Sequence, residues 1–502
     1  MEMNMTTVMS DPISDLYLNG HTTRVWGYRV PRERPHDLVK DKIMYARIAS
    51  NHWSSTENNS NNSWNVNFSS GNANNNNKYN GNVVRPVAAL REDTKLGWIE
   101  AFTSCCLKKK SSIQCSLYRS FYEFDLLRLA SEVESRTYYP TTSHCFVVTR
   151  PKLREIFAAN FRDRVVQHWI INRVEPLLEE RFESQGNVSF NCRKGYGTIK
   201  AVESLRDDIE KISEGYTKET WIGKFDMANF FMSIDTEILL SLLIPFIRKN
   251  YKGDDIETLI WVTEVTVRSR PQENCIRKGR ISLWNVLEPR KSLFNNSPGV
   301  GMPIGNITSQ LLANFYLSFF DEYMISLCSR YGGSYRRFVD DFVIVCNSKS
   351  AIKVMYRKGT EFLRDSLHIK IHPDKIYIQE ATKGVKFVGS VIKPGRIYLS
   401  ARTISGLDKK LEKLEKLCKK ILRTPPGSRL NSLYDLKHYI SSCNSYMGFL
   451  IHCSTYAIRV KMYERLNYFW KVCEMSEDYD LVKPKDQFKL KNYFKYASSR
   501  KK

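Results

Sequence analysis

Two adjacent acidic residues, Asp340 and Asp341, stand between two runs of strand-forming residues, and no other feature constrains the fold as much. The flanking runs are residues 335–338 and 342–345. Acidic residues are disfavoured inside a strand, whereas a tight turn between paired strands accommodates them. The pattern therefore predicts a β-hairpin that carries the two acids at its turn. The alternative is an ordinary solvated turn, which is what most Asp-Asp pairs form.

A third acid, Asp226, lies within another apolar run, residues 221–234. Carboxylates on two neighbouring strands can hold two divalent cations about 3.5–4 Å apart, an arrangement that promotes in-line displacement at phosphorus. Asp226, Asp340 and Asp341 are therefore the candidate catalytic and metal-binding residues. Two Mg²⁺ ions are the expected cofactors, and the chemistry expected is that of a polymerase.

A glycine-rich loop lies between the two acidic segments. Residues 299–310 contain three glycines and a proline, and the residues that follow have apolar positions at helical spacing. Glycine allows a ligand to approach the backbone, so the loop is expected to lead into a helix N-terminus beside a phosphate or a templating base. A glycine-rich loop before a helix is weak evidence by itself, because many are plain connections.

The order of these segments resembles the palm of reverse transcriptases. Residues 226–231, 301–310 and 338–341 are similar to motifs A, B and C of that family. Residues 150–168 resemble the fingers of retron-like and diversity-generating members, and residues 191–198 resemble the segment that meets the incoming triphosphate. Residues 371–375 and 384–390 are similar to motifs D and E. The resemblance covers roughly residues 97–400.

Motif B departs from the common pattern of the family. Most reverse transcriptases have Gln-Gly and then Ser-Pro there, whereas this chain has Ile304-Gly305 and then Ser309-Gln310. That form resembles the diversity-generating and defence-associated groups, so the chain is identified as resembling this class, which includes retron-like and unknown-group enzymes.

The resemblance implies an α+β fold of the right-hand polymerase type, with an antiparallel sheet in the palm and an Asn-rich N-terminal extension. The expected division is an extension at 1–96, fingers at 97–220, a palm at 221–400 with a basic insertion at 250–297, a helical thumb at 401–480 and a basic tail at 481–502. Within the thumb, residues 407–422, 433–450 and 456–472 have helical spacing.

The extension is dominated by Asn, Ser and Gly at residues 51–82 but also contains spaced aromatic residues. A disordered polar arm and an ordered, turn-rich module are both open. In either case the segment is expected to serve RNA contact or self-assembly, so a homo-oligomer is open as well.

Composition agrees with a polyanionic partner. The 502 residues include 77 Lys and Arg against 53 Asp and Glu, a formal charge of +24, and 42% are hydrophobic. Such an excess predicts nucleic acid binding that weakens with salt. No apolar run is long enough to span a bilayer and no signal peptide is evident, so a cytoplasmic location without membrane contact is expected. The 12 cysteines lack zinc-site spacing and indicate free thiols.

The resemblance also implies roles for individual residues. Arg193 and Lys194 would clamp the triphosphate, with Lys152 and Arg154 as weaker candidates, and Phe231 would exclude a ribose 2′-hydroxyl. Gly305 and Gln310 would contact the nucleotide, and Lys375 is a candidate proton donor to pyrophosphate. Basic residues at further positions are expected to contact nucleic acid: Lys152, Arg154, Lys108, Lys109, Lys110, Arg277, Lys278, Lys413, Lys416 and Lys420.

The leading interpretation is an RNA-directed DNA polymerase that uses dNTPs to copy a dedicated structured noncoding RNA into cDNA. Antiphage defence ranks first as its role, and diversification of a target gene by a diversity-generating element ranks second. A non-catalytic RNA-binding protein on the same scaffold and an RNA-dependent RNA polymerase are the competing classes. The primer is open, and a hydroxyl of Tyr493 or Tyr496 is one candidate.

Overall fold

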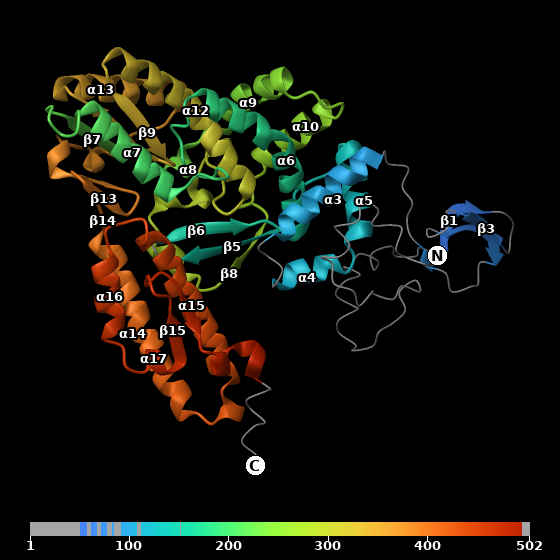
Figure 1. The fold of residues 1–502 in the computed structure, drawn as a ribbon. Helices are drawn as coiled ribbons and strands as arrows, with labels where there is room; N and C mark the ends of the chain where they lie inside the picture. Colours follow the sequence, from blue (N-terminus) through green and yellow to red (C-terminus); the bar gives the residue numbers. More distant parts are fainter. Residues whose placement is uncertain are drawn as a thin grey trace. The chain divides into compact units, whose positions relative to one another are not determined.

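Figure 1 shows the computed structural model of the chain, which describes residues 92–107, 112–150 and 152–493 and the backbone of four strands between Asn51 and Val84. The chain divides into two compact units. The first comprises residues 1–141, 159–172 and 257–266, and the second comprises residues 142–158, 173–256 and 267–502.

The described residues of the first unit contain a small sheet, three helices before residue 141, and parts of the helices α6 (Phe161–Ser184) and α10 (Ile256–Arg268). The sheet has the order β3-β2-β1-β4 and lies within the Asn-rich segment. Its pairing agrees with the ordered alternative for that segment. The elements are β1 (Asn51–Glu57), β2 (Asn62–Asn67), β3 (Asn72–Asn77), β4 (Val83–Val84), α3 (Glu92–Cys106), α4 (Ile113–Arg119) and α5 (Tyr122–Glu134).

Helix α5 shows why this unit packs. Its buried residues Leu126, Leu129, Ala130 and Val133 follow the three- and four-residue spacing of a single helix face. In the same unit, the carboxylate of Asp163 accepts hydrogen bonds from the Tyr138 hydroxyl and from the Thr141 amide and hydroxyl.

The palm of the second unit is an antiparallel sheet in the order β11-β7-β10-β9. Its strands are β7 (Trp221–Asp226), β9 (Ser334–Phe338), β10 (Asp341–Cys346) and β11 (Tyr377–Glu380). Residues 342–346 are all buried, as expected of a strand that is covered on both faces.

Helices cover the two faces of this sheet (Figure 1). Helix α7 (Thr198–Ile212) shares an apolar core with Ile222, Val343 and Val345. Helices α12 (Ile307–Arg330) and α13 (Lys349–Leu367) meet the other face, where Phe342 packs against Phe320 and Phe225 stacks on Tyr356. Helix α12 is the helix predicted after the glycine-rich loop, and it is buried on most sides, as a central core helix should be.

The fingers contain a sheet in the order β6-β5-β8, formed by β5 (Ser143–Val148), β6 (Arg154–Ala158) and β8 (Cys275–Lys278). Strand β8 lies inside the basic insertion expected at 250–297, and it pairs with β5. Residues 275–278 of the insertion therefore extend the fingers sheet. The other elements between β6 and α12 in the sequence, apart from α7 and β7, are α6 (Phe161–Ser184), α8 (Phe230–Ser233), α9 (Thr236–Asn250), α10 (Ile256–Arg268), α11 (Ser282–Val286), η1 (Pro289–Lys291) and η2 (Leu293–Asn295).

After the palm, a sheet in the order β12-β13-β14 leads into the thumb. Its elements are η3 (Pro373–Lys375), η4 (Ala381–Lys383), β12 (Val385–Phe387), β13 (Ser390–Lys393) and β14 (Arg396–Leu399). The thumb contains α14 (Ala401–Arg423), η5 (Pro426–Ser428), α15 (Leu430–Leu450), α16 (Tyr456–Glu464) and α17 (Phe469–Val472).

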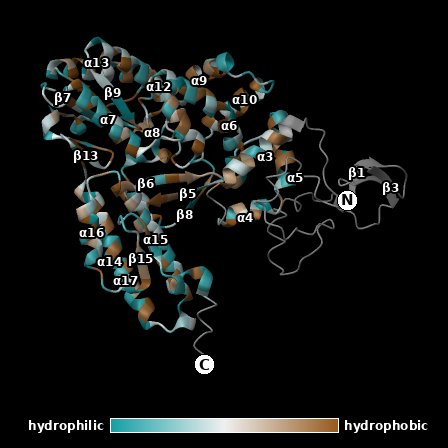
Figure 2. Ribbon diagram, in the orientation of Figure 1, coloured by the Kyte–Doolittle hydropathy of each residue, from teal (hydrophilic) through white to brown (hydrophobic). Residues whose placement is uncertain are grey.

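The thumb helices form as the sequence spacing predicts. Leu407, Leu411 and Leu414 of α14 are buried, whereas its lysines face outward, and Figure 2 shows hydrophobic and hydrophilic positions alternating along this helix. One prediction needs correction, because residues 456–472 form two helices rather than one. The break follows Glu464, where the amides of residues 467–469 turn to donate to the carboxylate of Glu415.

Residues 481–493 belong to a packed part of the thumb. Strands β15 (Cys473–Met475) and β16 (Val482–Pro484) pair, and η6 (Asp486–Phe488) and η7 (Leu490–Asn492) follow. Val482 and Phe488 are buried in the thumb core. The predicted basic tail at 481–502 is therefore wrong for residues up to 493, and its remaining residues lie outside the described part of the chain.

Phe488→Ala is expected to lower the free energy of unfolding of the protein by about 3 kcal/mol, because it removes a buried ring from the thumb core. Urea unfolding followed by circular dichroism measures this loss. The exposed Lys491→Ala provides the matched control and should change little. An unchanged stability for Phe488→Ala would mean that this segment is not part of the thumb.

Among the described residues, no helix combines the length and the apolar character needed to cross a bilayer. All 12 cysteines are free thiols, as expected from their spacing.

Candidate active site

The acid pair lies at the end of the predicted hairpin. Strand β9 ends at Phe338 and β10 begins at Asp341, and these two residues are paired, so Val339 and Asp340 form the loop. Val339 has a φ of +57°. A positive φ suits the tight turn of a hairpin but is costly for a β-branched side chain. The hairpin is confirmed, with Asp340 in its loop and Asp341 as the first residue of its second strand.

Strand β7 places Asp226 directly opposite Asp341. Side chains of directly opposed residues on antiparallel strands leave the same face of the sheet, with Cβ atoms about 4.5–5.5 Å apart. The Met227 amide also donates to the Asp340 carbonyl oxygen at 3.1 Å, which ties the loop to the end of β7. The predicted meeting of residue 226 with the 340–341 hairpin is therefore confirmed.

Lysine side chains pair with two of the three carboxylates. The Lys375 ammonium donates to Asp226 Oδ2, and Lys224 Nζ lies 3.5 Å from Asp341 Oδ1. Lys375 sits on η3, and burial together with the positive charges of Lys152 and Lys224 lowers its pKa. The third carboxylate, Asp340, has a raised pKa because it is buried and because Asp341 carries a like charge, while Arg154 and Lys152 partly offset this.

This donor set fits a divalent cation chemically. Two acidic groups, Asp340 and Asp341, are held so close that one raises the pKa of the other, and carboxylate oxygens are the ligands that Mg²⁺ prefers. Within the part of the chain that the structure describes, however, no three acidic, histidine or cysteine side chains are already grouped around a metal position. The three carboxylates share one end of the sheet, where Lys375 and Lys224 pair with two of them, and the expectation of two Mg²⁺ ions stays a prediction.

The glycine-rich loop is fixed to the fingers sheet. The Phe157 amide of β6 donates to the Ile304 carbonyl oxygen at 2.8 Å. Gly305 follows with a φ of +127°, and a Cβ atom built there would lie 2.5 Å from the Phe157 carbonyl oxygen. Glycine is therefore required by both the backbone conformation and the contact, and the nucleotide-binding role predicted for Gly305 coincides with a position where backbones meet closely.

Phe231 and Gln310 border the same loop. The Met302 amide donates to the Phe231 carbonyl oxygen at 2.8 Å, and the half-buried Phe231 ring packs with Ile304 against one apolar cluster. The exposed Gln310 Oε1 lies 3.7 Å from the Cys192 Sγ. The loop thus links the predicted steric gate to residues 191–198.

Arg193 does not have the role predicted from sequence. Its side chain is fully buried and donates to Glu179, the Ser189 carbonyl oxygen and Asn187, at 2.9, 2.9 and 2.7 Å. The guanidinium also lies 3.9 Å from the centre of the Tyr196 ring. These partners leave Arg193 as a support for its own loop rather than as a triphosphate clamp. Lys194, in contrast, is 85% exposed and pairs with Glu175.

The other basic candidates are mostly at the surface. Arg277 is exposed and stacks on Phe294 at 4.0 Å. Lys278 Nζ lies 3.3 Å from His144 Nε2. Among the predicted nucleic-acid contacts, the exposed residues on the thumb, on β6 and just before β6 are Lys413, Lys416, Lys420, Arg154 and Lys152. Lys108, Lys109, Lys110 and Tyr496 lie outside the described residues, and the Tyr493 hydroxyl donates to the Gly427 carbonyl oxygen.

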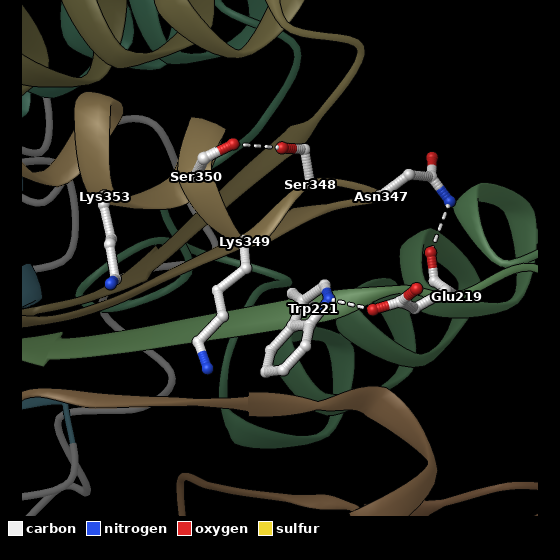
Figure 3. Close-up of a pocket in the computed structure, with 7 residues that line it drawn as sticks. All are labelled: Glu219, Trp221, Asn347, Ser348, Lys349, Ser350 and Lys353. Carbon is white, nitrogen blue, oxygen red and sulfur yellow. Dashed lines mark hydrogen bonds between the residues drawn. The ribbon is translucent and has the colours of Figure 1, made fainter.

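A hollow of about 540 Å³ lies elsewhere, at the opposite end of β7 from Asp226 (Figure 3). Trp221 begins that strand, and its indole donates to Glu219 while Lys349 lies over the ring at 4.3 Å. The residues that line the hollow are Glu219, Trp221, Asn347, Ser348, Lys349, Ser350 and Lys353. It contains none of the three aspartates, so it is separate from the candidate reaction centre.

Sequence reasoning missed two residues of the site. Lys224 lies two positions before Asp226, and strand alternation would have placed both on one face. Arg337, a charged residue inside an apolar strand beside the acid pair, is also missing from the predicted set. Its signal was the cost of burying a charge, which requires a partner.

Comparisons with known proteins agree with this geometry. Residues 149–392 match the family described as reverse transcriptase (RNA-dependent DNA polymerase). Protein YkfC of Escherichia coli (strain K12) is 23% identical over 365 residues, which cover 64% of this chain and 87% of that protein.

Solved structures of telomerase show a weaker likeness. Apo telomerase from Candida Tropicalis has a TM-score of 0.38 and 12% identity, covering 65% of this chain and 62% of that one. Its form truncated from the C-terminal domain has a TM-score of 0.36 and 13% identity, covering 52% and 55%. The chain thus spans less than two thirds of either telomerase, and at these scores the likeness does not bear on what it does. The match over residues 149–392 shows that the chain carries a reverse transcriptase domain, and the fingers, palm and thumb described above agree with it.

Proposed function

We propose that this chain is an RNA-directed DNA polymerase that copies a dedicated structured noncoding RNA into cDNA, with Asp226, Asp340 and Asp341 as ligands of two Mg²⁺ ions. The observation that carries the proposal is the pairing of β7 with β10, in which Asp226 lies opposite Asp341 and Asp340 occupies the adjoining loop. Bound at these carboxylates, Mg²⁺ would lower the pKa of the primer 3′-hydroxyl and neutralise charge on the triphosphate.

The chain's own cations support binding of a dNTP beside the carboxylates. The charges of Lys152 and Arg154 act on Asp340, and those of Lys152 and Lys224 act on Lys375, so these side chains lie near enough to influence the charges of the candidate site. We assign Lys152 and Arg154 to the triphosphate, since charge-assisted bonds to phosphate are strong. Lys375 is assigned as the proton donor to pyrophosphate, because a lowered ammonium pKa favours release of its proton.

The direct test is extension of a primer by the full-length protein with dNTPs, on matched RNA and DNA templates, while the Mg²⁺ concentration is varied. The expected result is incorporation that requires both Mg²⁺ and the RNA template. Tight RNA binding without any incorporation would favour the non-catalytic RNA-binding alternative. Incorporation of ribonucleotides in place of dNTPs would favour an RNA-dependent RNA polymerase.

The template is tested by sequencing the RNA that copurifies with the protein. One RNA of defined sequence is expected. Replacing Lys413, Lys416 and Lys420 of the exposed α14 face by Gln provides a control, because each lost phosphate contact should reduce the salt dependence of RNA binding by about one unit of slope. A mixture of unrelated RNAs would contradict a dedicated template.

For the biological role we propose antiphage defence, which rests on the Ile304-Gly305 form of motif B and on the long Asn-rich extension. A plaque assay with cells that carry the gene tests it: fewer plaques are expected, and no protection against any phage would contradict it. Sequence changes in a neighbouring repeat-flanked gene would instead support diversification.

Phe231→Ala is expected to admit ribonucleotides, because the half-buried ring beside the motif B loop would no longer block a 2′-hydroxyl. The measurement is the ratio of kcat/KM for a dNTP to that for the corresponding ribonucleotide. Phe230→Ala is the matched control, because the Phe230 ring is buried and its centre lies 5.4 Å from the centre of the Phe231 ring, in an edge-on arrangement. The control should lower stability without changing the ratio, and an unaltered ratio in Phe231→Ala would refute the assignment.

A further inference from the structure

Arg337 is a buried charge directly behind the acid pair. Its side chain is 1% exposed and lies on β9, in the strand that leads into the loop of Val339 and Asp340. Its Nε and Nη2 donate to the two carboxylate oxygens of Asp321 at 2.6 and 2.5 Å, a two-pronged pair with a side chain of α12 that is itself 0% exposed. An ion pair this deeply buried must satisfy its hydrogen bonds within the protein, because no water replaces them.

The remaining hydrogen bonds of this guanidinium reach the loop and the motif B helix. Arg337 Nη1 donates to the Val339 carbonyl oxygen at 3.1 Å, and Nη2 donates to Asn314 Oδ1 at 2.9 Å. Asn314 in turn donates to the Asn191 carbonyl oxygen at 3.3 Å. One side chain therefore connects the loop of the acid pair to α12 and, through Asn314, to residues 191–198.

The loop needs such a contact because its backbone is strained. A β-branched residue at a φ of +57° is unfavourable and persists only where the surroundings hold it. Two hydrogen bonds do so: Arg337 holds the Val339 carbonyl oxygen, and the Met227 amide holds the Asp340 carbonyl oxygen. The first bond is made by an arginine that is anchored to α12, and the second is made by the residue that follows β7.

We infer that Arg337 is a positioning residue that sets where the carboxylates of Asp340 and Asp341 stand, by fixing the Val339 carbonyl oxygen against α12. The inference rests on the proposed function, in which these carboxylates bind divalent cations. Without the Arg337 contact the loop relaxes toward an ordinary φ, and the carboxylates then meet a cation less often in the right position.

Arg336 offers a matched comparison within the same strand. It also forms a two-pronged pair, with Asp208 of α7 at 2.6 and 2.9 Å, and both side chains are largely buried. None of its hydrogen bonds goes to Val339 or Asp340. If the pairs only stabilise the fold, removal of either pair should have the same kind of effect. If Arg337 positions the acid pair, an effect on the acid pair should appear only when the Arg337 pair is removed.

The test uses full-length protein in which both members of a pair are replaced, so that no charge is left buried alone: Arg337→Met with Asp321→Leu, and Arg336→Met with Asp208→Leu. Mn²⁺ binding without substrates is measured from the paramagnetic resonance signal of the free ion, and primer extension gives kcat and KM. For the Arg337 pair, the Kd for Mn²⁺ is expected to rise about 10-fold and kcat to fall about 10- to 100-fold, with KM for the dNTP at the parental value. The Arg336 pair should lose thermal stability but keep the parental Kd.

A folded Arg337 pair with the parental Kd for Mn²⁺ would overturn the inference. If that pair fails to fold, Arg337→Lys decides, because it keeps a charge beside Asp321 but cannot reach Asp321, Asn314 and Val339 together. A parental Kd in Arg337→Lys overturns the inference, and a raised Kd supports it.

Asp340→Asn, measured in parallel, separates the two claims. If Asp340→Asn binds Mn²⁺ like the parent, the proposed metal site fails and the inference about Arg337 fails with it. If Asp340→Asn loses Mn²⁺ while the Arg337 variants keep the parental Kd, only the positioning role fails.

Discussion

Asp340→Asn is expected to reduce DNA synthesis by about 10²- to 10³-fold while leaving the free energy of unfolding equal to or above that of the parent. The loss follows from the position of Asp340 in the loop beside the Asp226–Asp341 pair, where the amide carries no negative charge to hold a cation. Single-turnover primer extension at saturating Mg²⁺ measures it.

The stability half of this prediction follows from the sign of the pKa shift. Burial and the charge of Asp341 raise the pKa of Asp340 above the unfolded value of 3.8, so the fold disfavours its carboxylate form. The stability that Asp340 contributes is therefore fully present below pH 3.8 and is lost as the pH rises through its folded pKa. At neutral pH the ionised group opposes folding, and an uncharged Asn removes that opposition.

Urea unfolding across the acidic to neutral range checks the sign. The parent should lose stability as the pH rises past the folded pKa of Asp340, and Asp340→Asn should lose less. The control is Asp341→Asn, which is expected to lower the free energy of unfolding because it loses the contact of 3.5 Å between Asp341 and Lys224. Retained DNA synthesis in Asp340→Asn, or a clear drop in its stability at neutral pH, would contradict the assignment.

Gly305→Ala is expected to lower the free energy of unfolding by about 2–4 kcal/mol, from a strained φ and an overpacked contact together. The added Cβ would lie 2.5 Å from the Phe157 carbonyl oxygen, at a φ of +127°. Since the contact atom belongs to the backbone of a strand, the loop has to move. The bond from the Phe157 amide to the Ile304 carbonyl oxygen then breaks, and DNA synthesis should fall with it.

Gly332→Ala is the matched control for this substitution. Gly332 has a φ of +65°, but nothing lies within 4 Å of a Cβ built there. It should therefore cost only about 1 kcal/mol, the price of the backbone conformation alone. Chemical denaturation of both variants gives the comparison. Equal losses would show that the close approach at Gly305 has no energetic consequence.

Local patterns predicted the elements of this fold well. The acid pair between two apolar runs predicted the hairpin of β9 and β10, and the glycine-rich loop predicted the start of α12 at Ile307. The spacing of leucines and lysines predicted α14. These predictions succeed because a turn or an amphipathic helix is specified by residues only a few positions apart.

Predictions about single charged side chains were less successful. Arg193 was expected to reach a triphosphate, yet its guanidinium is enclosed by Glu179, Asn187 and two aromatic rings. Residues 481–493 were expected to belong to a basic tail, yet Phe488 is in the thumb core. Both errors have one cause. The sequence of a basic residue or segment does not show whether it faces solvent or packs against other parts of the protein.

The sequence by itself determined where the hairpin, the glycine-rich loop and the thumb helices form, because turn chemistry, glycine conformation and strand alternation act over short stretches, and its resemblance to reverse transcriptase motifs pointed to the three carboxylates. The tertiary structure decided the partners. Lys375 donates to Asp226, which is 149 positions away in the sequence, and Lys224 pairs with Asp341. Arg337, anchored by Asp321, donates to the carbonyl oxygen of Val339 in the loop. Such pairings depend on which elements pack together and on how much water that packing removes, and neither quantity can be read from residues that are distant in the chain.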